Sequence, residues 1–401
     1  MLTRSVLISG IGLAGPTLAY WLTQCGFEPT LVERWPSPRT GGYVIDFWGL
    51  GYDVAERMGL LPSVESEGYH VVEVRFVDGR GRRVGGFGVD VFRKLTRGRY
   101  VSLQRTDLAA LLYRKIQGQC ETIFGDSIAG VEEDTDGVQV RFERGSARRF
   151  DLLVGADGLH SAVRRLVFGP QERFERYLGY AVAAFEVNGY RPRDENIYVS
   201  HSVPGKQVAR FTLRDDRTMF LFLFSTADDR LFGLRDAAAQ KAILHSEFDQ
   251  VGWECPQILE ALDESEELYF DRVSQIRMNR WSRGRVTLVG DAAFCPSLLA
   301  GQGSALAMTA AYILAGELAK AEGHIIRALA SYHEIMGAFI GDKQKAAERF
   351  AGSFAPKSRL GLFIRNQATR MLGIPGVAEL VLGRSLLDRL ELPHYPIPQE
   401  L

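Results

Sequence analysis

Residues 5–33, SVLISGIGLAGPTLAYWLTQCGFEPTLVE, decide the fold of this chain. The segment begins with a short apolar run, Ser5–Ser9, continues as a helical stretch up to Cys25 and ends with a second short run, Pro29–Glu33. Short apolar runs bounded by turn residues are typical of buried parallel strands, and the stretch between them suits a crossover helix. We therefore predict a βαβ unit that opens the protein.

The turn after the first predicted strand has the spacing of a dinucleotide fingerprint, Gly10-Ile-Gly12-Leu-Ala-Gly15. Gly10 permits a tight turn, Gly12 lets a pyrophosphate approach the helix N-terminus, and Gly15 lets the helix pack closely on the sheet. Glu33 ends the second strand, where it can accept hydrogen bonds from two ribose hydroxyls. The predicted dinucleotide contacts are therefore Gly10, Gly12, Leu13, Ala14, Gly15 and Glu33. The alternative is a glycine-rich turn with a surface glutamate.

An α/β pattern surrounds a strand-rich middle. Helices and short strands alternate as far as Gly155, except for a hairpin signal at Asp78-Gly79. Long alternating strands with one helix, near residues 237–251, fill residues 174–280, and Arg285–Val289 gives one more buried strand. We therefore predict an α/β fold in which a Rossmann-like domain is interleaved with a β-sheet domain and followed by helices.

The domain boundaries follow from these changes of pattern. We assign residues 1–70, 101–172 and 281–325 to the dinucleotide-binding domain, residues 71–100 and 173–280 to the β-sheet domain, and residues 326–401 to a C-terminal helical segment.

Composition and charge exclude several classes of protein. The chain has 401 residues, of which 46% are apolar, and 48 Lys and Arg stand against 49 Asp and Glu, for a net charge of −1. Such a chain can bury enough surface to fold, and it lacks the cationic excess of a nucleic-acid binder. The four cysteines form no CxxC pair and have no His at ligand spacing. We therefore expect a reduced, cytoplasmic protein that binds neither metal nor nucleic acid.

Two apolar segments superficially resemble export or membrane signals. The run that follows Arg4 looks like a signal peptide, but the glycine fingerprint explains the same residues and no A-x-A site follows. Residues 292–316 are uncharged and long enough to cross a bilayer. Because they contain Pro296 and several glycines, we expect a buried loop that leads into a small-residue helix, and no membrane partner.

Three further motifs follow the fingerprint in order and carry a resemblance to a known family. They are Arg105 in LQRTDLAALL, Asp157-Gly158-Leu-His-Ser161-Ala-Val-Arg164, and Gly290-Asp291-Ala-Ala-Phe294-Cys-Pro296 followed by Gly301-Gln302-Gly303. From Leu2 to about Leu318 the chain resembles the class A FAD-dependent monooxygenases, the para-hydroxybenzoate hydroxylase-like family that includes tetracycline-inactivating monooxygenases. The resemblance implies that the dinucleotide is FAD.

The resemblance also implies roles for individual residues. Asp157 belongs to a segment implicated in the pyrophosphate region and in pyridine-nucleotide access, and Asp291 binds the ribityl chain. Arg105 reaches the cofactor from the start of a helix, and the glycines after Asp291 present N–H groups to the flavin ring. The remaining predicted cofactor contacts are Arg34, Arg39 and Gly42 in the loop after Glu33, Asp46 near the ring, and Pro296, Gly301, Gln302 and Gly303.

Structural roles remain as alternatives for several of these residues. Asp157 could end a strand, Asp291 could cap a helix, Asp46 could cap a turn, and Arg105 could be a surface residue. His201 lies on an alternating strand, where it is more often solvent-facing or satisfied than catalytic. No general base is therefore assigned.

Two departures from the family pattern lie beside the predicted ring site. Phe294 stands where the family usually has a His, and Ser297-Leu298 stand where it has one or two prolines. These departures leave the predicted cofactor contacts unchanged, but they leave the substrate open.

The activity follows from the resemblance rather than from motif spacing. It implies an enzyme that uses NAD(P)H and O2 to hydroxylate an aromatic or polycyclic small molecule through a flavin C4a-hydroperoxide, as a monomer or homodimer. No second GxGxxG opens a helix, so NAD(P)H should bind transiently in a shared cleft. Two alternatives remain, a FAD-dependent dehydrogenase or reductase that does not use O2, and a non-catalytic carrier resembling GDP-dissociation inhibitors.

A pair of strands provides the expected substrate wall. If Asp215-Asp216 is a two-residue turn between VARFTLR and TMFLFLFS, Phe211 lies opposite Phe220. Because side chains alternate along a strand, one face then carries a set of phenylalanines. The predicted substrate pocket contains Phe211, Phe220, Phe222, Phe224 and Phe294. The alternative is that the phenylalanines form the core and that the opposite face lines the pocket, with Met219, Leu221 and Leu223.

Overall fold

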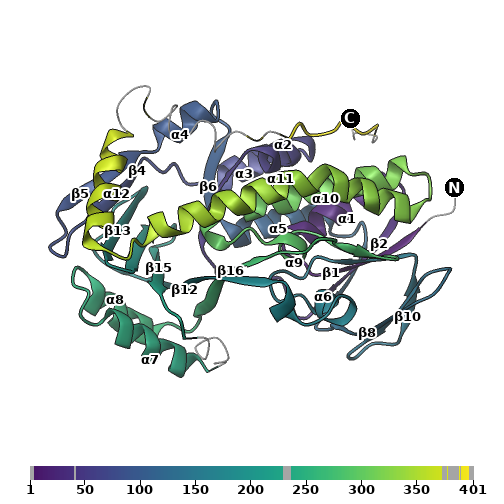
Figure 1. Ribbon diagram of the computed structural model, residues 1–401, viewed down its shortest axis with the longest axis horizontal. Helices are drawn as coiled ribbons and strands as arrows, with labels where there is room; N and C mark the ends of the chain where they lie inside the picture. Colours follow the sequence, from purple (N-terminus) through teal and green to yellow (C-terminus); the bar gives the residue numbers. More distant parts are fainter. Residues whose placement is uncertain are drawn as a thin grey trace.

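The computed structural model describes residues 4–39, 42–228, 236–372, 377, 388 and 390–396. Two large sheets lie at opposite ends of the long axis, and one long helix, α11 (Ile325–Phe354), runs along both (Figure 1). Two small sheets complete the described strands. They consist of β3 (Val44–Trp48) with β6 (Tyr100–Gln104), and of β8 (Ile128–Glu133), β9 (Val138–Phe142) and β10 (Arg148–Phe150).

The first large sheet contains the predicted βαβ unit. Its strand order is β17-β18-β11-β1-β2-β7, and all neighbours pair in parallel except β17 with β18. The strands are β1 (Ser5–Ser9), β2 (Glu28–Glu33), β7 (Glu121–Phe124), β11 (Leu152–Gly155), β17 (Ser282–Arg283) and β18 (Val286–Leu288). Helix α1 (Ala14–Gln24) connects β1 to β2, as predicted.

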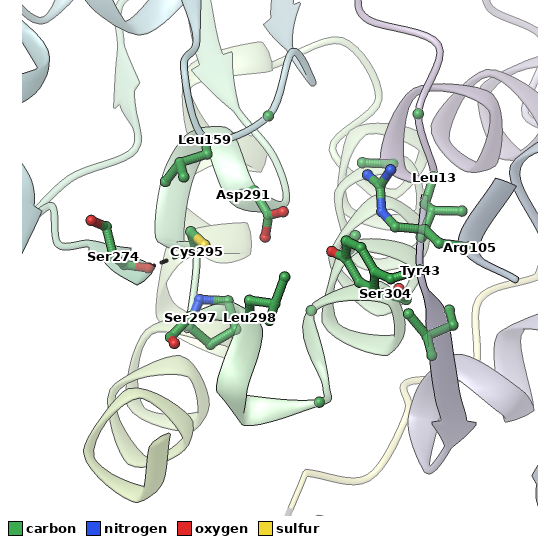
Figure 2. A pocket seen from close by; sticks show the side chains of 18 of the residues that line it. Leu13, Tyr43, Arg105, Leu159, Ser274, Asp291, Cys295, Ser297, Leu298 and Ser304 are labelled. Carbon is green, nitrogen blue, oxygen red and sulfur yellow. Dashed lines mark hydrogen bonds between the residues drawn. The ribbon is translucent and has the colours of Figure 1, made fainter. Parts of the chain in front are cut away.

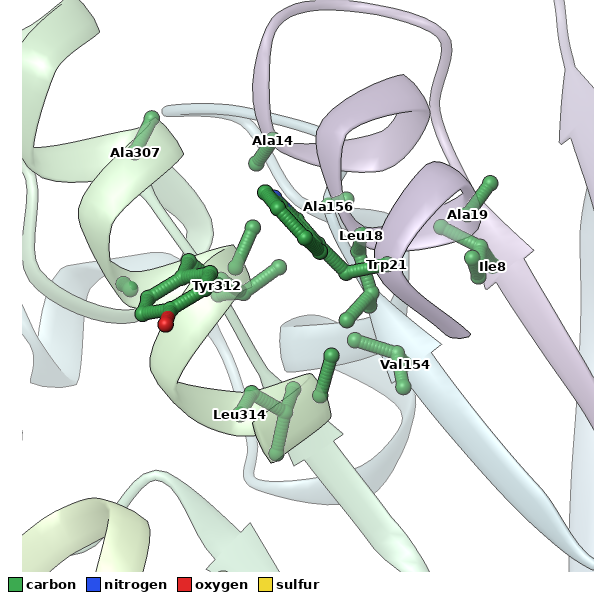
Figure 3. Close-up of a cluster of buried hydrophobic side chains, with 14 of the residues drawn as sticks. Ile8, Ala14, Leu18, Ala19, Trp21, Val154, Ala156, Ala307, Tyr312 and Leu314 are labelled. Atoms are coloured by element: carbon green, nitrogen blue, oxygen red, sulfur yellow. The ribbon is translucent and has the colours of Figure 1, made fainter. Parts of the chain in front are cut away.

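This sheet is covered by helices that bury almost continuous apolar surface. Helix α10 (Gly303–Lys320) packs against α1, and the rings of Tyr312 and Trp21 meet edge to face with centroids 4.9 Å apart (Figure 3). A helix that is apolar on all sides is stable when neighbouring elements cover all of it. The uncharged stretch that superficially resembles a membrane span therefore ends in a core helix. Among the residues that the structure describes, no helix combines the length and apolarity that a membrane crossing needs.

The second large sheet joins two separate stretches of the chain. Its order is β16-β12-β15-β14-β13-β4-β5. The strands are β4 (Glu73–Val77), β5 (Arg83–Gly88), β12 (Glu175–Asn188), β13 (Ile197–Val203), β14 (Lys206–Thr212), β15 (Arg217–Ser225) and β16 (Tyr269–Ile276). Because the β4–β5 hairpin pairs with β13, which is far away in the sequence, the predicted interleaving of two domains is confirmed.

The described helices include one that the sequence patterns missed. Helix α7 (Ala237–Phe248) was expected, whereas α8 (Cys255–Glu264), which packs beside it, was not. The others are α2 (Leu50–Arg57), α3 (Leu61–Glu67), α4 (Asp90–Leu95), α5 (Arg105–Ile116), α6 (Ala162–Val167), α9 (Asp291–Phe294), α12 (Arg359–Met371) and the 3-10 turns η1 (Gln171–Arg173) and η3 (Leu298–Ala300). Most of the predicted helical stretch beyond residue 372 lies outside the described residues.

The register between β14 and β15 differs from the prediction by one residue. Phe211 lies opposite Met219, and the backbone N–H of Leu213 donates to the carbonyl of Arg217 at 2.9 Å. The loop therefore has three residues, because Arg214 leaves the strand. Its guanidinium donates to backbone carbonyls at the end of α3, including that of Glu67 at 2.8 Å. This attachment explains why a two-residue turn does not form.

Candidate functional site

A cavity lies at the carboxyl ends of the parallel strands, where the first sheet meets the second (Figure 2). Ligands of open α/β sheets bind at this edge. The cavity is lined by Gly12, Leu13 and Ala14, by Tyr43 and Ile45, by Arg105, by Ala156, Gly158 and Leu159, by Tyr269, Arg272 and Ser274, and by Asp291, Cys295, Pro296, Ser297, Leu298, Gly301, Gly303, Ser304 and Ala307. It therefore combines the glycine turn with the two later motifs.

The three glycines of the turn have different surroundings. An added Cβ would lie 2.6 Å from the Ala156 carbonyl oxygen at Gly10 and 2.0 Å from the Gly10 carbonyl oxygen at Gly15. At Gly12 its nearest neighbour would be Nη2 of Arg105, at 3.8 Å. Gly10 and Gly15 therefore permit close packing of the backbone, whereas Gly12 borders open space inside the cavity.

The N-terminus of α1 faces this open space without a side chain of its own to cap it. The N-cap residue, Leu13, makes no side-chain capping hydrogen bond, and the first turn contains no acidic residue. Unpaired N–H groups and the positive end of a helix dipole attract phosphate. The turn therefore fits the pyrophosphate of a dinucleotide.

Glu33 is held beside the turn by backbone donors. Its Oε2 accepts a hydrogen bond from the Ile11 N–H at 2.9 Å, and its Oε1 accepts one from the Trp35 N–H at 3.2 Å. A carboxylate oxygen can accept a second donor beyond these. The predicted ribose contact is therefore compatible with this geometry, and it remains a prediction.

We expect Glu33→Ala to weaken FAD binding by about tenfold or more. Hydrogen bonds between a ribose hydroxyl and an ionised carboxylate contribute roughly 1.5–3 kcal/mol, and about 1.4 kcal/mol corresponds to a factor of ten. The dissociation constant can be measured by titrating apoprotein with FAD. Glu33→Gln, which keeps the shape of the side chain and one acceptor oxygen but loses the charge, is the matched control, and its affinity for FAD should lie between those of the wild type and of Glu33→Ala. Unchanged affinity in a folded Glu33→Ala protein contradicts the ribose contact.

Arg105 and Asp291 approach the cavity from opposite walls (Figure 2). Arg105 is the first residue of α5, and Asp291 is the first residue of α9. Burial raises the pKa of the Asp291 carboxyl, and the positive charge of Arg105 opposes this shift. The cavity thus offers a carboxylate for hydroxyl groups and a guanidinium for phosphate.

The alignment with known proteins agrees with this chemistry. A family model described as an FAD binding domain matches residues 3–339. The chain belongs to this family of FAD-binding domains. A flavin-dependent monooxygenase from an unidentified prokaryote is 36% identical to this flavoprotein over 403 residues, which cover 98% of this chain and 99% of the relative.

Two solved structures have the same fold as this flavoprotein. The crystal structure of tetracycline destructase Tet(55) matches with a TM-score of 0.83 and 32% identity, over 98% of this chain and 99% of that one. Klebsiella pneumoniae HpxO in complex with FAD and uric acid matches with a TM-score of 0.77 and 25% identity, over 95% and 97% of the two chains. The predictions of the family, of the fold and of a FAD-dependent monooxygenase are confirmed.

The Asp157 motif of the flavoprotein holds two cavity loops together. Asp157 does not line the cavity, because its carboxylate accepts hydrogen bonds from Ser161 Oγ at 2.5 Å and from the Ala162 N–H at 2.8 Å, at the start of α6. The fully buried Arg164 donates to the carbonyls of Leu159 at 2.6 Å and Ala292 at 2.8 Å. Both residues thus position the cavity wall, and a direct cofactor contact of Asp157 remains a prediction.

His160 ties the same loop to the second sheet. Its Nε2 lies 2.9 Å from Oδ2 of Asp271, and its Nδ1 lies 3.2 Å from Oε1 of Gln171. Hydrogen bonding to Asp271 raises the pKa of the imidazole. The ring therefore bridges Asp271 to the loop that contains the cavity residue Leu159.

We expect the contribution of His160 to stability to be largest at acidic pH. A raised pKa in the folded state means that the contribution is fully present below the unfolded pKa, about 6.5, and is lost as the pH rises through the folded value. The melting temperature of His160→Gln should therefore fall further below that of the wild type at about pH 6 than at about pH 9. An equal difference at both pH values would contradict the ion pair.

The segment after Asp291 forms the wall where the resemblance places the ring. Ser297 has a φ of 100°, although it is not a glycine, and its Oγ accepts a hydrogen bond from the Leu299 N–H at 3.2 Å. Gly301 has a φ of 64° and, like Gly303, lines the cavity. Gln302 is the N-cap residue of α10 and is not among the lining residues.

Several other predicted cofactor residues are not among the residues that line the cavity. The guanidinium groups of Arg34 and Arg39 lie 5.9 and 5.3 Å from the ring centroid of the exposed Trp35. Gly42 has a φ of 133°, and its neighbours Thr40 and Gly41 lie outside the described residues. Asp46 lies on the face of β3 opposite to Ile45, which lines the cavity. The cofactor contacts of these residues remain predictions.

None of the five members of the predicted aromatic wall is among the residues that line the cavity. Phe220, Phe222 and Phe224 are fully buried on the sheet face covered by α7 and α8, and the rings of Phe222 and Phe248 have centroids 4.7 Å apart. Phe294 packs on Trp281, with centroids 4.8 Å apart, in the core. Phe220, Phe222, Phe224 and Phe294 are all buried, because a large apolar ring is most stable where neighbouring elements exclude water.

The opposite face of β15 is the one that approaches the cavity. Leu221 and Leu223 cluster with Leu298, Leu299 and Tyr269, of which Leu298 and Tyr269 line the cavity. This is the alternative that the sequence left open. Phe211 shares this face with Met219, but it is fully buried and stacks on Tyr198, with centroids 4.3 Å apart.

Tyr43 and Tyr269 are cavity residues that the sequence patterns did not single out. Their rings lie 5.8 Å apart, and burial raises the pKa of both hydroxyls. Tyr43 directly follows the glycine pair at residues 41 and 42, which was a usable signal. Tyr269 is the first residue of β16 and has no motif around it.

His201 is a satisfied core residue. Its Nδ1 lies 2.9 Å from the Val77 carbonyl oxygen, and its Nε2 lies 3.1 Å from the Val251 carbonyl oxygen. The ring therefore connects β13 to β4 and to the segment after α7, and it is not exposed to the cavity.

Proposed function

We propose that this flavoprotein uses NAD(P)H and O2 to hydroxylate a planar aromatic or polycyclic small molecule. One observation carries the proposal. A single cavity is bounded by the FAD-binding motifs on one side and by an apolar face of the second sheet on the other. A flat apolar substrate can therefore lie against the sheet while it faces the ring.

The relatives support this class of substrate. One solved relative is a tetracycline destructase and another holds uric acid together with FAD, so both names concern ring-containing small molecules. The sheet side contributes Leu221, Leu223 and Leu298 to the apolar cluster beside the cavity.

The residues of this chain would bind FAD, orient the substrate and exclude water. The α1 N-terminus and Arg105 would hold the phosphates, and Asp291 would accept hydrogen bonds from ribityl hydroxyls. Bound FAD would supply the redox chemistry, which is hydride transfer from the reductant and activation of O2. The apolar cluster around Leu298 keeps water from the reacting ring, which limits loss of reducing equivalents to peroxide.

The hydroxyl groups that line the cavity are weak acids. Burial raises the pKa of Tyr43 and Tyr269, so their hydroxyls stay protonated and can donate hydrogen bonds to a substrate oxygen. Ser274, Ser297 and Ser304 add three further hydroxyls among the lining residues. These groups can orient a phenol without removing its proton.

The test is a coupled assay on the purified protein. The visible spectrum should show bound FAD, NADPH oxidation should be slow alone, and candidate phenols should raise it severalfold while one oxygen atom from ¹⁸O2 enters the product. A fast rate that does not depend on substrate and yields no oxygenated product favours a reductase. A protein without FAD absorption contradicts the whole proposal.

A further inference from the structure

A second polar group lies on the other face of the strand that borders the cavity. Asp46 on β3 pairs directly with Ser102 on β6. Its Oδ1 accepts hydrogen bonds from Ser102 Oγ and from the hydroxyl of Tyr100, both at 2.6 Å. The two hydroxyls lie 3.2 Å from each other, so one carboxylate oxygen is fixed by a compact triad.

The other oxygen of Asp46 is unused. Within the described parts of the chain, no donor bonds Oδ2, and no Arg, Lys or His forms an ion pair with Asp46. Burial raises the pKa of this carboxyl, and the bonds from Ser102 and Tyr100 oppose the shift. A half-buried carboxylate without a counter-ion is partly desolvated at a cost, and a cationic ligand would remove much of that cost.

Aromatic rings surround the carboxylate. Tyr100 lies against Trp48 with centroids 6.3 Å apart and stacks on Phe92 with centroids 6.1 Å apart. Tyr198 lies close enough that burial first, and the negative charge of Asp46 second, raise the pKa of its hydroxyl. None of the four side chains Asp46, Trp48, Tyr100 and Tyr198 is fully covered, so solvent still reaches this group. Aromatic faces beside a carboxylate are the chemistry that recognises an organic cation.

The position of this group connects it to the proposed active site. On the same face of β3, the Val44 N–H lies 3.2 Å from Sδ of Met219 on the second sheet. At the other end of this face, the Trp48 ring lies 3.5 Å from the point where a Cβ on the cavity residue Gly301 would sit. Asp46 therefore lies between the sheet and the loop where the resemblance places the flavin ring.

We propose that Asp46, Tyr100 and Ser102 form a subsite for a protonated amine, and that the substrate is an aromatic molecule that carries one. The inference rests on the proposed function and narrows its substrate class. The ammonium group would donate to Oδ2 of Asp46 and lie against the rings of Trp48 and Tyr100. This role replaces the contact with the flavin ring that the sequence suggested for Asp46.

The test compares three phenols that differ in charge. Purified FAD-loaded protein is titrated with tyramine, 4-ethylphenol and 4-hydroxyphenylacetate while the flavin absorption spectrum is followed. We expect tyramine to bind about tenfold or more tightly than 4-ethylphenol and the carboxylate to bind most weakly. Equal affinities of tyramine and 4-ethylphenol, or no binding of tyramine, overturn the inference, and this comparison needs no variant.

Variants test whether the Asp46 side chain causes the preference for tyramine over 4-ethylphenol. Asp46→Asn should bring tyramine and 4-ethylphenol to within about twofold of each other, with the affinity for 4-ethylphenol unchanged. Asp53→Asn is the matched control, since Asp53 on neighbouring α2 is already paired with Arg99 at 2.6 Å, and it should keep the wild-type ratio. A preference that persists in Asp46→Asn overturns the subsite. Absence of FAD or of NADPH oxidation in the wild type instead contradicts the proposed function.

Discussion

Gly12→Ala should fold like the wild type but be purified without FAD. An added Cβ at Gly12 has no neighbour closer than 3.8 Å, and its φ lies outside the left-handed region that disfavours alanine. The methyl group would project into the space that the pyrophosphate needs at the α1 N-terminus. The loss of two hydrogen bonds to a charged group, at roughly 1.5–3 kcal/mol each, weakens binding by about a hundredfold or more. Flavin content, FAD titration and thermal unfolding of the apoprotein measure the three parts of this expectation.

Gly15→Ala is the matched control on the same turn. Its Cβ would lie 2.0 Å from the Gly10 carbonyl oxygen, so the helix must move away from the sheet. Overpacking of this kind costs about 1–3 kcal/mol or more, and the apoprotein itself should therefore unfold at lower temperature. If Gly12→Ala retained FAD with normal affinity, the pyrophosphate would have to bind elsewhere.

The part of the fold that local patterns determine was predictable. Ser5–Glu33 forms the expected strand, helix and strand, because the apolar runs, the glycine turn and the crossover length all favour the same unit. The hairpin at Asp78-Gly79 was predictable for the same reason. The site residues that follow from these units, from Gly12 to Ala14, do line the cavity.

The parts that depend on distant contacts were not predictable. The predicted register of β14 and β15 was wrong by one residue because Arg214 donates hydrogen bonds to backbone carbonyls near Glu67. These carbonyls are 146 to 148 residues away in the sequence. A shift of one residue moves a side chain to the other face of its strand pair, which placed Phe211 with the wrong partners. Likewise, the Asp46 group requires β3 and β6 to pair across more than fifty residues, and no local pattern indicates that pairing.

Phe222→Ala should destabilise the protein strongly and leave its kinetics nearly unchanged. Phe222 is fully buried, contacts Phe248 on α7, and lies in a cluster with Phe220 and Phe224. Truncation of a core phenylalanine costs about 3–5 kcal/mol. Urea unfolding should show this loss in the free energy of unfolding, while the KM for the substrate and the coupling of NADPH oxidation to product remain close to the wild type.

Leu221→Ala on the same strand should have the opposite effect. Its side chain points to the other face, where it packs only partly buried beside Leu298 and Leu299. Removal of a half-buried leucine costs less stability than that of a buried phenylalanine, but it opens the apolar cluster beside the cavity to water. More of the NADPH oxidised should therefore yield peroxide instead of product. If Phe222→Ala uncouples turnover and Leu221→Ala does not, the face assignment is reversed, and the substrate lies on the α7 and α8 side of the sheet.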